Sequence, residues 1–351
     1  MAAVCREPDS WSTAVDKNSF DAALRPGVRA ALAPSNSALR RAEDQAFRRL
    51  LDEDGQFLPG ASFVRACPHC ATAPATASPV LQAHGMHLLR CAGCNLVYSR
   101  EVINRDFERQ RYQASQAADA NMALKIDPHY AALEQDKARY VMARLGSLAG
   151  SGRVLDIGSS TGALLQAATA AGWNASGVEI NPAAVEHCQQ QGLQVVCGEY
   201  PCALPAGWGP FDAVLMLDVL EHLPDPLAFL ARVSADMQPG GWLVIQVPNF
   251  RSLLITIEGG RNNNICHGHW SYFEPHTLPG LLRQAGFDMR FFETYISELD
   301  RILAYPDAVV ASAWQQLTGQ LLLQPRQLTV EHVHQAMLGY KLFGIFQKVA
   351  A

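Results

Sequence analysis

Short apolar runs alternate with helical stretches through the second half of the chain, and this alternation constrains the fold more than any other feature. The runs of strand-like composition are Val154–Ile157, Ala175–Ile180, Val195–Cys197, Phe211–Leu217, Trp242–Val247, Phe287–Tyr295 and Lys341–Val349. The helical stretches are Ala163–Ala171, Pro182–Gln191, Pro226–Met237 and Thr277–Ala285. Nearly continuous apolar strands interleaved with helices indicate a mostly parallel sheet that is covered on both faces. We therefore predict an α/β fold built on a Rossmann-like sheet.

The chain of 351 residues is long enough for roughly two domains of ~150 residues each. We predict an N-terminal arm with one helix over residues 1–60, a small cysteine-rich unit over 61–100, a helical linker over 101–150 and an α/β domain over 151–351. In the arm, Ser37 is the predicted N-cap of a helix that ends before Asp52. A helical insertion over 299–338 interrupts the α/β domain, and we interpret it as a lid or a dimer contact.

The composition excludes several classes of protein. There are 28 Lys and Arg residues against 33 Asp and Glu residues, which gives a net charge of -5. A dedicated nucleic-acid-binding protein or a polybasic membrane-surface protein needs a basic excess instead. The N-terminus contains Arg6, Glu7 and Asp9 with no apolar segment, and no uncharged stretch is apolar enough to span a membrane. We expect no membrane contact, a cytoplasmic location and reduced thiols.

The nine cysteines are therefore read as metal ligands, core residues or catalysts rather than as disulfide partners. Cys67 and Cys70 form one CxxC pair, Cys91 and Cys94 form a second, and twenty residues separate the pairs. Each pair places two thiolates on a tight turn, and two such turns close a tetrahedral site with no open position. The spacing predicts a structural zinc ion in a small zinc ribbon. A redox CxxC explains the pattern less well, because two pairs are present.

The segment Val154–Gly162 joins the first strand of the predicted sheet to a helix, at the edge where doubly wound sheets bind ligands. Gly158 permits a tight turn, and Gly162 permits close approach of a ligand. Glu179 lies near the end of the next strand, where it can accept hydrogen bonds from two ribose hydroxyls. The glycine spacing is not the GxGxxG of a pyrophosphate cradle, and Asp156 would repel a phosphate but attract an amine. A nucleoside cofactor with an amine and no phosphate, such as S-adenosylmethionine, fits these features best.

With further segments included, the chain resembles the class I S-adenosylmethionine-dependent methyltransferases that carry an N-terminal zinc ribbon. The segments that carry the resemblance are Val154–Gly162, Gly177–Pro182, Phe211–Leu223, Pro239–Leu243 and Val247–Asn249. Together with the cysteine pairs, the resemblance covers residues 67–295 and implies the seven-stranded sheet of that family. The sequence departs from the family at Ser160, where a glycine is usual. The serine hydroxyl could still meet the amino-acid end of the cofactor.

The resemblance also implies a set of cofactor-binding residues, position by position. They are Asp156, Gly158, Ser160 and Gly162 for the methionyl part, Glu179 for the ribose hydroxyls, Glu199 for the adenine amino group, and Asp218 and Val219 for the sulfonium side. Glu199 has an equally good alternative interpretation as a carboxylate of a surface loop.

Methyl transfer from a sulfonium is an in-line displacement, and pre-positioning can supply ~7–11 kcal/mol of the acceleration. A base is needed only where the acceptor must lose a proton, and histidine suits that role near neutral pH. His222 follows the fourth predicted strand and His269 precedes an aromatic cluster, so we predict these two as catalytic residues. His267 and His276 are weaker candidates. We interpret Cys266, His267 and His269 as polar loop residues rather than as a second metal site.

The predicted function is methylation of a small-molecule acceptor, with oxygen as the favoured atom, in a biosynthetic pathway and with a homodimer as an option. Methylation at carbon or nitrogen of a sugar or another metabolite stays open. Zinc-ribbon relatives of the family include sugar C-methyltransferases, which usually carry a further C-terminal domain. An RNA or protein methyltransferase is less favoured, because Arg90 is the only charged residue between Cys67 and Cys94. An NAD-dependent oxidoreductase and a catalytically silent scaffold are the remaining alternatives, the first disfavoured by the glycine spacing and the second supported by Ser160 alone.

Overall fold

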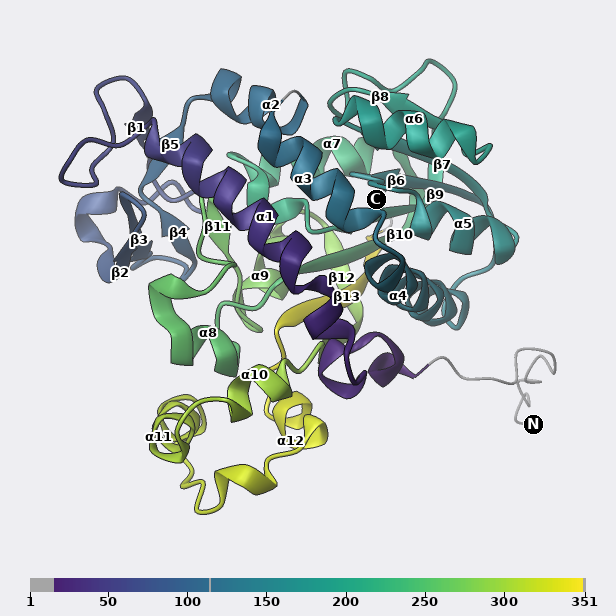
Figure 1. Cartoon of the computed structure of the whole chain (residues 1–351). Coiled ribbons are helices and arrows are strands. Elements are labelled where there is room, and N and C mark those ends of the chain that lie inside the picture. Colours follow the sequence, from purple (N-terminus) through teal and green to yellow (C-terminus); the bar gives the residue numbers. More distant parts are fainter. Residues whose placement is uncertain (1–15, 114, 350–351) are drawn as a thin grey trace.

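The computed structural model describes residues 16–113 and 115–349, and Figure 1 shows their arrangement. The central strands are β6 Arg153–Ile157, β7 Asn174–Glu179, β8 Val195–Cys197, β9 Phe211–Leu217, β10 Met237–Pro248, β12 Phe287–Tyr295 and β13 Lys341–Lys348. They form one seven-stranded sheet in the order β12-β13-β10-β9-β6-β7-β8. Neighbours pair in parallel from β10 to β8, whereas β13 is antiparallel to both β10 and β12. The predicted α/β fold with its Rossmann-like sheet is confirmed.

The helices that cover this sheet are α4 Pro128–Gly146, α5 Ala163–Ala170, α6 Pro182–Gln190, α7 Pro226–Ala235 and α9 Thr277–Gln284. Successive residues of a strand point to opposite faces, so each strand contributes side chains to two hydrophobic cores. On β9, Ala213 and Leu215 join the core under α4 and α5, whereas Val214 and Met216 join the core under α7 and α9. Burial on both faces explains why these strands are almost continuously apolar in sequence.

The predicted elements agree with the structure to within a few residues, with two larger differences. β10 begins at Met237 rather than at Trp242, because the chain first pairs with β9 and then bulges before regular pairing resumes. The N-terminal helix α1 spans Val28–Arg48, so the predicted N-cap Ser37 lies inside the helix and that prediction is wrong. Gly27, with a φ of 81°, turns the chain into the helix earlier than the sequence pattern indicated.

The remaining N-terminal elements are η1 Lys17–Phe20, η2 Ala22–Leu24, α2 Arg105–Gln113 and α3 Gln116–Lys125. α1 crosses the molecule and packs on α3 and α4 (Figure 1). Phe20 contacts Tyr140 of α4 and Tyr295 of β12, with ring centroids 5.5 and 5.1 Å apart. An aromatic contact therefore anchors the start of the described chain to one face of the sheet.

The cysteine-rich segment forms β1 Ser62–Val64, η3 Pro74–Thr76, β2 Ser78–Ala83, β3 Met86–Arg90, β4 Val97–Ser99 and β5 Glu101–Ile103. β1 pairs with β5, while β2, β3 and β4 form an antiparallel sheet that is completed by β11 (Ser271–Tyr272) from the α/β part of the chain. Arg90 adds a bidentate ion pair to the buried Glu274, with N–O distances of 2.7 and 2.9 Å. The cysteine-rich segment and the α/β part therefore share a sheet as well as a hydrophobic core.

The predicted helical insertion and the helices near it are α8 Leu253–Glu258, η5 Gly259–Arg261, α10 Leu299–Leu303, α11 Asp307–Thr318, η6 Pro325–Gln327 and α12 Val330–Gln335. In Figure 1, α10, α11 and α12 form a lobe next to α8. Arg301 of α10 pairs with Glu258 at the end of α8 at 2.9 Å, and Tyr305 donates to the same carboxylate at 3.0 Å. Across the described ranges, no helix combines the length and apolar character that a membrane crossing requires.

Candidate active site

The loop after β6 forms a cradle at the carboxyl edge of the sheet. Gly158 and Gly162 have φ angles of 80° and 83°, in the region that favours glycine. A Cβ atom at Gly158 would lie 2.9 Å from the Val219 side chain, and one at Gly162 would lie 2.4 Å from Leu193. The loop lies between β6 and β9, at the point where the strand order reverses and open α/β sheets bind ligands. Both glycines are therefore required by backbone conformation and by space.

Ser160 in this loop also has a positive φ, of 52°, so the serine adopts the conformation that glycine favours. Its N–H donates to Oε2 of Glu179 at 2.8 Å, and the N–H of Asn181 donates to Oε1 at 2.8 Å. Each carboxylate oxygen can accept more than one hydrogen bond. Glu179 is thus held rigidly at the end of β7 and can still accept from two hydroxyls of a ligand.

Asp156 lies beneath the glycine loop and is only 1% exposed. Burial and the charge of Glu179 raise the pKa of Asp156 to about 8, and Lys137 of α4 acts in the opposite direction. Within the described chain, Oδ2 of Asp156 and the hydroxyl of Ser159 are buried without a hydrogen-bond partner. Because an unsatisfied buried polar atom is costly, these two atoms mark a place where a donor from a ligand would fit.

Asp218 stands at the end of β9 in a network of charges. Nζ of Lys341 donates to Oδ1 of Asp218 at 2.8 Å, and Nε2 of Gln246 donates to Oδ2 at 2.6 Å. Burial would raise the pKa of Asp218, but the charges of Lys341 and Lys137, together with these hydrogen bonds, lower it below its ordinary value. Asp218 is therefore an anion at neutral pH, and both of its oxygens are oriented by side chains of β10 and β13.

Just beyond Asp218, the 3-10 helix η4 (Leu220–His222) brings Glu221 and His222 against His269, which lies in a loop far along the chain. The two imidazole rings meet edge to face, with their centroids 4.7 Å apart. One donor atom from each of the three side chains lies within 4.8 Å of the other two. The structure thus joins both predicted histidines to a carboxylate that the sequence did not single out.

Backbone carbonyls orient both rings. Nδ1 of His222 lies 2.8 Å from the carbonyl oxygen of Gly268, and Nδ1 of His269 lies 2.9 Å from that of Asn264. A carbonyl oxygen can only accept, so each Nδ1 carries a hydrogen and donates it to the backbone. Burial lowers the pKa of His269 well below its ordinary value, and the charges of His222 and Lys341 act in the same direction. His269 is therefore neutral at pH 7.

Glu221 is 1% exposed, and neither of its carboxylate oxygens has a hydrogen-bond partner among the residues the structure describes. Burial and the charge of Asp218 raise its pKa well above the ordinary value, while Lys341 opposes this shift. A buried carboxylate in this state is unfavourable unless it is protonated or meets a cation. We therefore expect Glu221 to be protonated or to bind a cationic ligand.

Glu199, which was predicted to approach adenine, follows β8 and pairs with two arginines of α2. Its carboxylate lies 2.5 Å from Arg105 and 3.0 Å from Arg109. Burial would raise the pKa of Glu199, but the hydrogen bonds and charges of the two arginines lower it. These ion pairs tie α2 to the loop after β8, and the role of Glu199 toward adenine stays a prediction.

The weaker histidine candidates do not join the cluster. Nε2 of His267 lies 2.6 Å from the backbone oxygen of His84, and its ring stacks on Phe47 with centroids 4.0 Å apart. His276 is exposed at the N-terminus of α9. Among the described residues, two groups of side chains have metal-binding spacing, and neither contains Cys266 or His267.

The second such group consists of the four cysteines of the CxxC pairs. The Sγ atoms of Cys67 and Cys94 are 3.6 Å apart, those of Cys70 and Cys91 are 3.4 Å apart, and all four lie within 4.8 Å of one another. Thiolates about 2.3 Å from a zinc ion in a tetrahedron lie about 3.8 Å from each other. The four sulfur atoms therefore have the dimensions of a tetrahedral zinc site.

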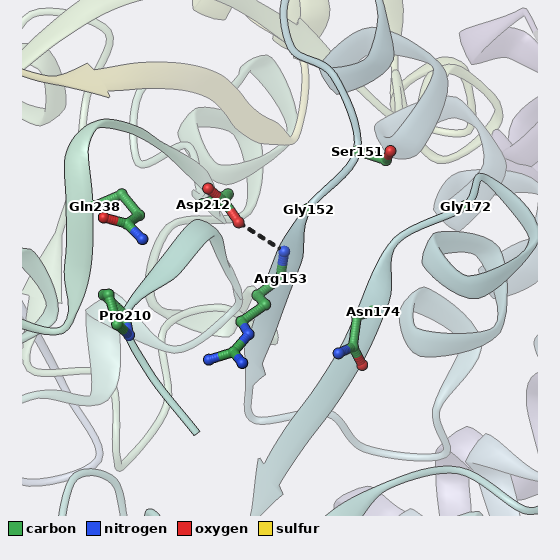
Figure 2. Close-up of a pocket in the computed structure, with 8 residues that line it drawn as sticks. All are labelled: Ser151, Gly152, Arg153, Gly172, Asn174, Pro210, Asp212 and Gln238. Carbon is green, nitrogen blue, oxygen red and sulfur yellow. Dashed lines mark hydrogen bonds between the residues drawn. The ribbon is translucent and has the colours of Figure 1, made fainter. Parts of the chain in front are cut away.

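An open pocket of about 410 Å³ lies at the opposite edge of the sheet (Figure 2). Residues at the starts of parallel strands line it, among them Arg153, Asn174 and Asp212. The N–H of Arg153 donates to Asp212 at 2.8 Å, as Figure 2 shows. Since the glycine loop follows the other ends of these strands, this pocket takes no part in the candidate active site.

Three charged residues of the crevice were missed in the sequence. Lys137 stands on α4, Glu221 on η4, and Lys341 at the start of β13. Lysine and glutamate are almost never fully buried unless they are paired, so sequence patterns place them on the surface by default. The only available signal was the position of Glu221 directly before His222, on the same turn.

Comparisons with known proteins find similar sequences and structures. Residues 130–290 match a family described as a methyltransferase domain. A ubiquinone biosynthesis O-methyltransferase from Thiobacillus denitrificans is 29% identical over 152 residues, which are 39% of this chain and 64% of that protein. The enzyme of the same name from Bordetella avium is 29% identical over 205 residues, 54% of this chain and 84% of that protein. A solved structure of magnesium protoporphyrin IX methyltransferase from Synechocystis, with bound S-adenosylhomocysteine, has a TM-score of 0.46 at 14% identity and covers 70% of this chain and 100% of its own.

The segment that matches the methyltransferase domain begins in α4 and ends in β12. It contains the glycine loop, Asp218 and the cluster of Glu221, His222 and His269. The match of residues 130–290 to a methyltransferase domain confirms the predicted enzyme class, an S-adenosylmethionine-dependent methyltransferase, for this part of the chain.

Proposed function

We propose that this enzyme methylates a hydroxyl oxygen of a small molecule in a biosynthetic pathway. The observation that carries the proposal is the buried cluster of Glu221, His222 and His269, next to Asp218 at the end of the central strand. This cluster offers imidazole and carboxylate groups where a hydroxyl would have to lose its proton. The names of the two relatives, both ubiquinone biosynthesis O-methyltransferases, support oxygen as the acceptor atom.

The residues around the glycine loop fit S-adenosylmethionine. The unpartnered Oδ2 of Asp156 can accept from the ammonium group of the cofactor, and this contact would keep Asp156 ionised. Glu179 can accept from the ribose hydroxyls, and several acidic groups complement a cationic cofactor. The proposed contacts are Asp156, Gly158, Ser160 and Gly162 for the methionyl part, Glu179 for the ribose, Glu199 for adenine, and Asp218 and Val219 for the sulfonium side.

When bound, S-adenosylmethionine supplies a methyl group on a positively charged sulfur. The protein holds the acceptor oxygen in line with that methyl group and excludes water from the crevice. His269 is buried and neutral, so Nε2 can take the hydroxyl proton as the oxygen attacks. His222 is the second candidate for this role, and its ring is oriented in the same way by a backbone carbonyl.

We also propose that Cys67, Cys70, Cys91 and Cys94 bind one structural zinc ion, because their sulfur atoms have the required spacing. This zinc ribbon includes β4, which pairs with β11 directly after His269 and Trp270. The N–H of Trp270 in turn donates to the backbone oxygen of Glu221 at 2.8 Å. Four cysteines would fill all coordination positions of this zinc ion, so it would take no part in the chemistry. It would act here by holding the loop that carries His269 in place.

The division into an arm, a zinc ribbon, a linker and a methyltransferase domain is likewise a proposal. We further propose that the insertion over 299–338 serves as a lid or as the contact of a homodimer. Its loop exposes Leu321 and Leu323 at 71% and 85% of their surfaces, which supports a surface that meets a partner or a substrate.

Labelled cofactor tests the proposed function. The purified enzyme is incubated with methyl-labelled S-adenosylmethionine and an extract of its host, and the products are separated by size. The label should appear in a small molecule whose mass has increased by one methylene group. It should be strongly reduced in His269→Gln and retained in His276→Gln, a matched exposed histidine outside the cluster. Label confined to RNA or protein would contradict the proposal and favour a macromolecular acceptor.

A further inference from the structure

We infer that Asn264 and Tyr272 recognise the acceptor, and that the acceptor carries a carbonyl or carboxylate oxygen close to the hydroxyl that is methylated. This inference rests on the proposed O-methylation and deepens it by naming a class of substrate. The observation behind it is that two polar side chains beside His269 are buried without a hydrogen-bond partner in the described chain. Both can donate a hydrogen bond, and neither belongs to the cluster of Glu221, His222 and His269.

Asn264 presents its side-chain amide from a well-anchored loop. Its backbone N–H donates to Oδ1 of Asn262 at 2.9 Å, and its carbonyl oxygen accepts from Nδ1 of His269 at 2.9 Å. Asn262 is fixed in turn, because its Oδ1 also accepts from the hydroxyl of Tyr340 at 2.9 Å. Asn264 is 7% exposed, and its Nδ2 atom is buried without a partner among the residues that the structure describes. An amide nitrogen can only donate, so we expect this atom to meet an oxygen of a ligand.

Tyr272 offers the second unpartnered group. Its backbone pairs with Val97 of β4, and its ring meets those of Phe250 and His269 edge to face, with centroids 5.5 and 6.4 Å apart. The residue is 4% exposed, and within the described ranges its hydroxyl is buried without a hydrogen-bond partner. Burial and the charge of Cys266 raise the pKa of Tyr272 well above its ordinary value. The hydroxyl therefore keeps its hydrogen at neutral pH and can donate it to a ligand.

Two unsatisfied donors beside one histidine define what the acceptor must offer. A buried donor without a partner lowers the stability of the fold, so such groups are rare unless a ligand satisfies them. A carbonyl or carboxylate oxygen has two lone pairs and can accept from both donors. That oxygen lies close to the reacting hydroxyl, because Asn264 is hydrogen-bonded to the imidazole that is proposed to take the hydroxyl proton. Sites that hydrogen-bond a substrate reject analogues without the bonded group, so Asn264 and Tyr272 select hydroxy acids and hydroxy ketones over simple alcohols.

Methyl transfer into a host extract tests this inference. The full chain receives labelled S-adenosylmethionine and increasing amounts of extract, and label in small molecules gives a maximal rate and a half-saturating amount of extract. In Tyr272→Phe and in Asn264→Ala, the half-saturating amount should rise roughly two- to tenfold through the loss of one hydrogen bond. The affinity for S-adenosylhomocysteine, measured by calorimetry, should not change. Tyr98→Phe is the matched control and should behave as wild type, because its buried and unpartnered hydroxyl lies in the core with Cys67 and Cys91.

Thermal unfolding without acceptor separates recognition from a structural role. Tyr272→Phe removes one oxygen atom that has no hydrogen-bond partner in the described structure, so its melting temperature should be no lower than that of the wild type. A lower melting temperature would show that the hydroxyl stabilises the fold and would contradict the inference.

The chemical structure of the labelled product tests the substrate class. Mass spectrometry and nuclear magnetic resonance should show a carbonyl or carboxylate group attached to the carbon that carries the new methyl ether or to its neighbour. A methyl ether without this group, or wild-type half-saturation in both variants, would overturn the inference and leave the O-methyltransferase intact. If the wild type labels no small molecule at all, the proposed function itself is wrong.

Discussion

The ammonium group of Lys341 lies 2.8 Å from the carboxylate of Asp218, and this contact joins the start of the last strand to the end of the central strand. Burial would lower the pKa of Lys341, but the charges of Asp218 and Glu221 raise it above its ordinary value. The crevice therefore contains a fixed ion pair beside the neutral His269. This ion pair fixes one positive and one negative charge in the crevice where methyl transfer is proposed to occur.

Replacement of Lys341 by methionine should destabilise the protein by roughly 1–3 kcal/mol, because Asp218 loses its charged partner. The loss stays below that of a fully buried pair, since the Asp218 side chain is 37% exposed and solvent screens its charge. Denaturant unfolding at neutral pH measures this loss. Much of it should be recovered in the double variant Lys341→Met/Asp218→Asn, which removes both charges. If the double variant instead loses as much free energy of unfolding as the two single variants together, the two residues do not interact.

The buried Asp156 should make the stability of the cofactor-free protein depend on pH. Its pKa is about 8 in the folded protein, raised from 3.8 by burial and by Glu179. Folding therefore favours the protonated form, and the stability that this group contributes is present below about pH 4 and is lost as the pH rises through about 8. The melting temperature of the wild type should fall relative to that of Asp156→Asn between about pH 5 and about pH 9. A difference that does not change with pH would contradict this account.

Local patterns were sufficient for the fold. The strand Phe211–Leu217 was predicted with its observed bounds, because a short apolar run between turns has few alternatives. The start of α1 could not be predicted from Ser37, since a good N-cap residue can also lie inside a longer helix. Glu221 was missed for a different reason. Its importance arises from His269, which is distant in sequence and is brought close by the hydrogen bond from the N–H of Trp270 to the backbone oxygen of Glu221.

Replacement of Gly162 by alanine should weaken cofactor binding at least tenfold and destabilise the chain. The new Cβ would lie 2.4 Å from Leu193, in addition to the strain of a φ of 83°. Gly172 is the matched control, because it has a φ of 84° and a Cβ added there would meet no atom within 4 Å. Gly172→Ala should cost only the conformational strain of roughly 1–2 kcal/mol. Calorimetric titration with S-adenosylhomocysteine compares the two, and equal affinities would refute a role of the loop in binding.

Substitution of Cys91 by serine should abolish binding of the proposed structural zinc and reduce methyl transfer, although the four-cysteine group is separate from the cluster of Glu221, His222 and His269. The reason is that the zinc ribbon pairs through β4 with β11, next to the loop that carries His269. Cys197→Ser, at an exposed cysteine outside the four-cysteine group, is the control and should keep its zinc and its activity. Zinc content and turnover are measured on the same preparations. Full activity in a zinc-free Cys91→Ser protein would show that methyl transfer does not depend on the zinc ribbon.

Nuclear magnetic resonance of the methylated product tests the central claim most directly. The enzyme is supplied with S-adenosylmethionine that carries an isotope-labelled methyl carbon, and the labelled product is isolated from the small-molecule fraction. Our account predicts the carbon resonance of a methyl ether, formed by wild type and nearly absent with the Gly162→Ala and His269→Gln variants. A resonance of a methyl group bound to carbon or nitrogen would contradict it.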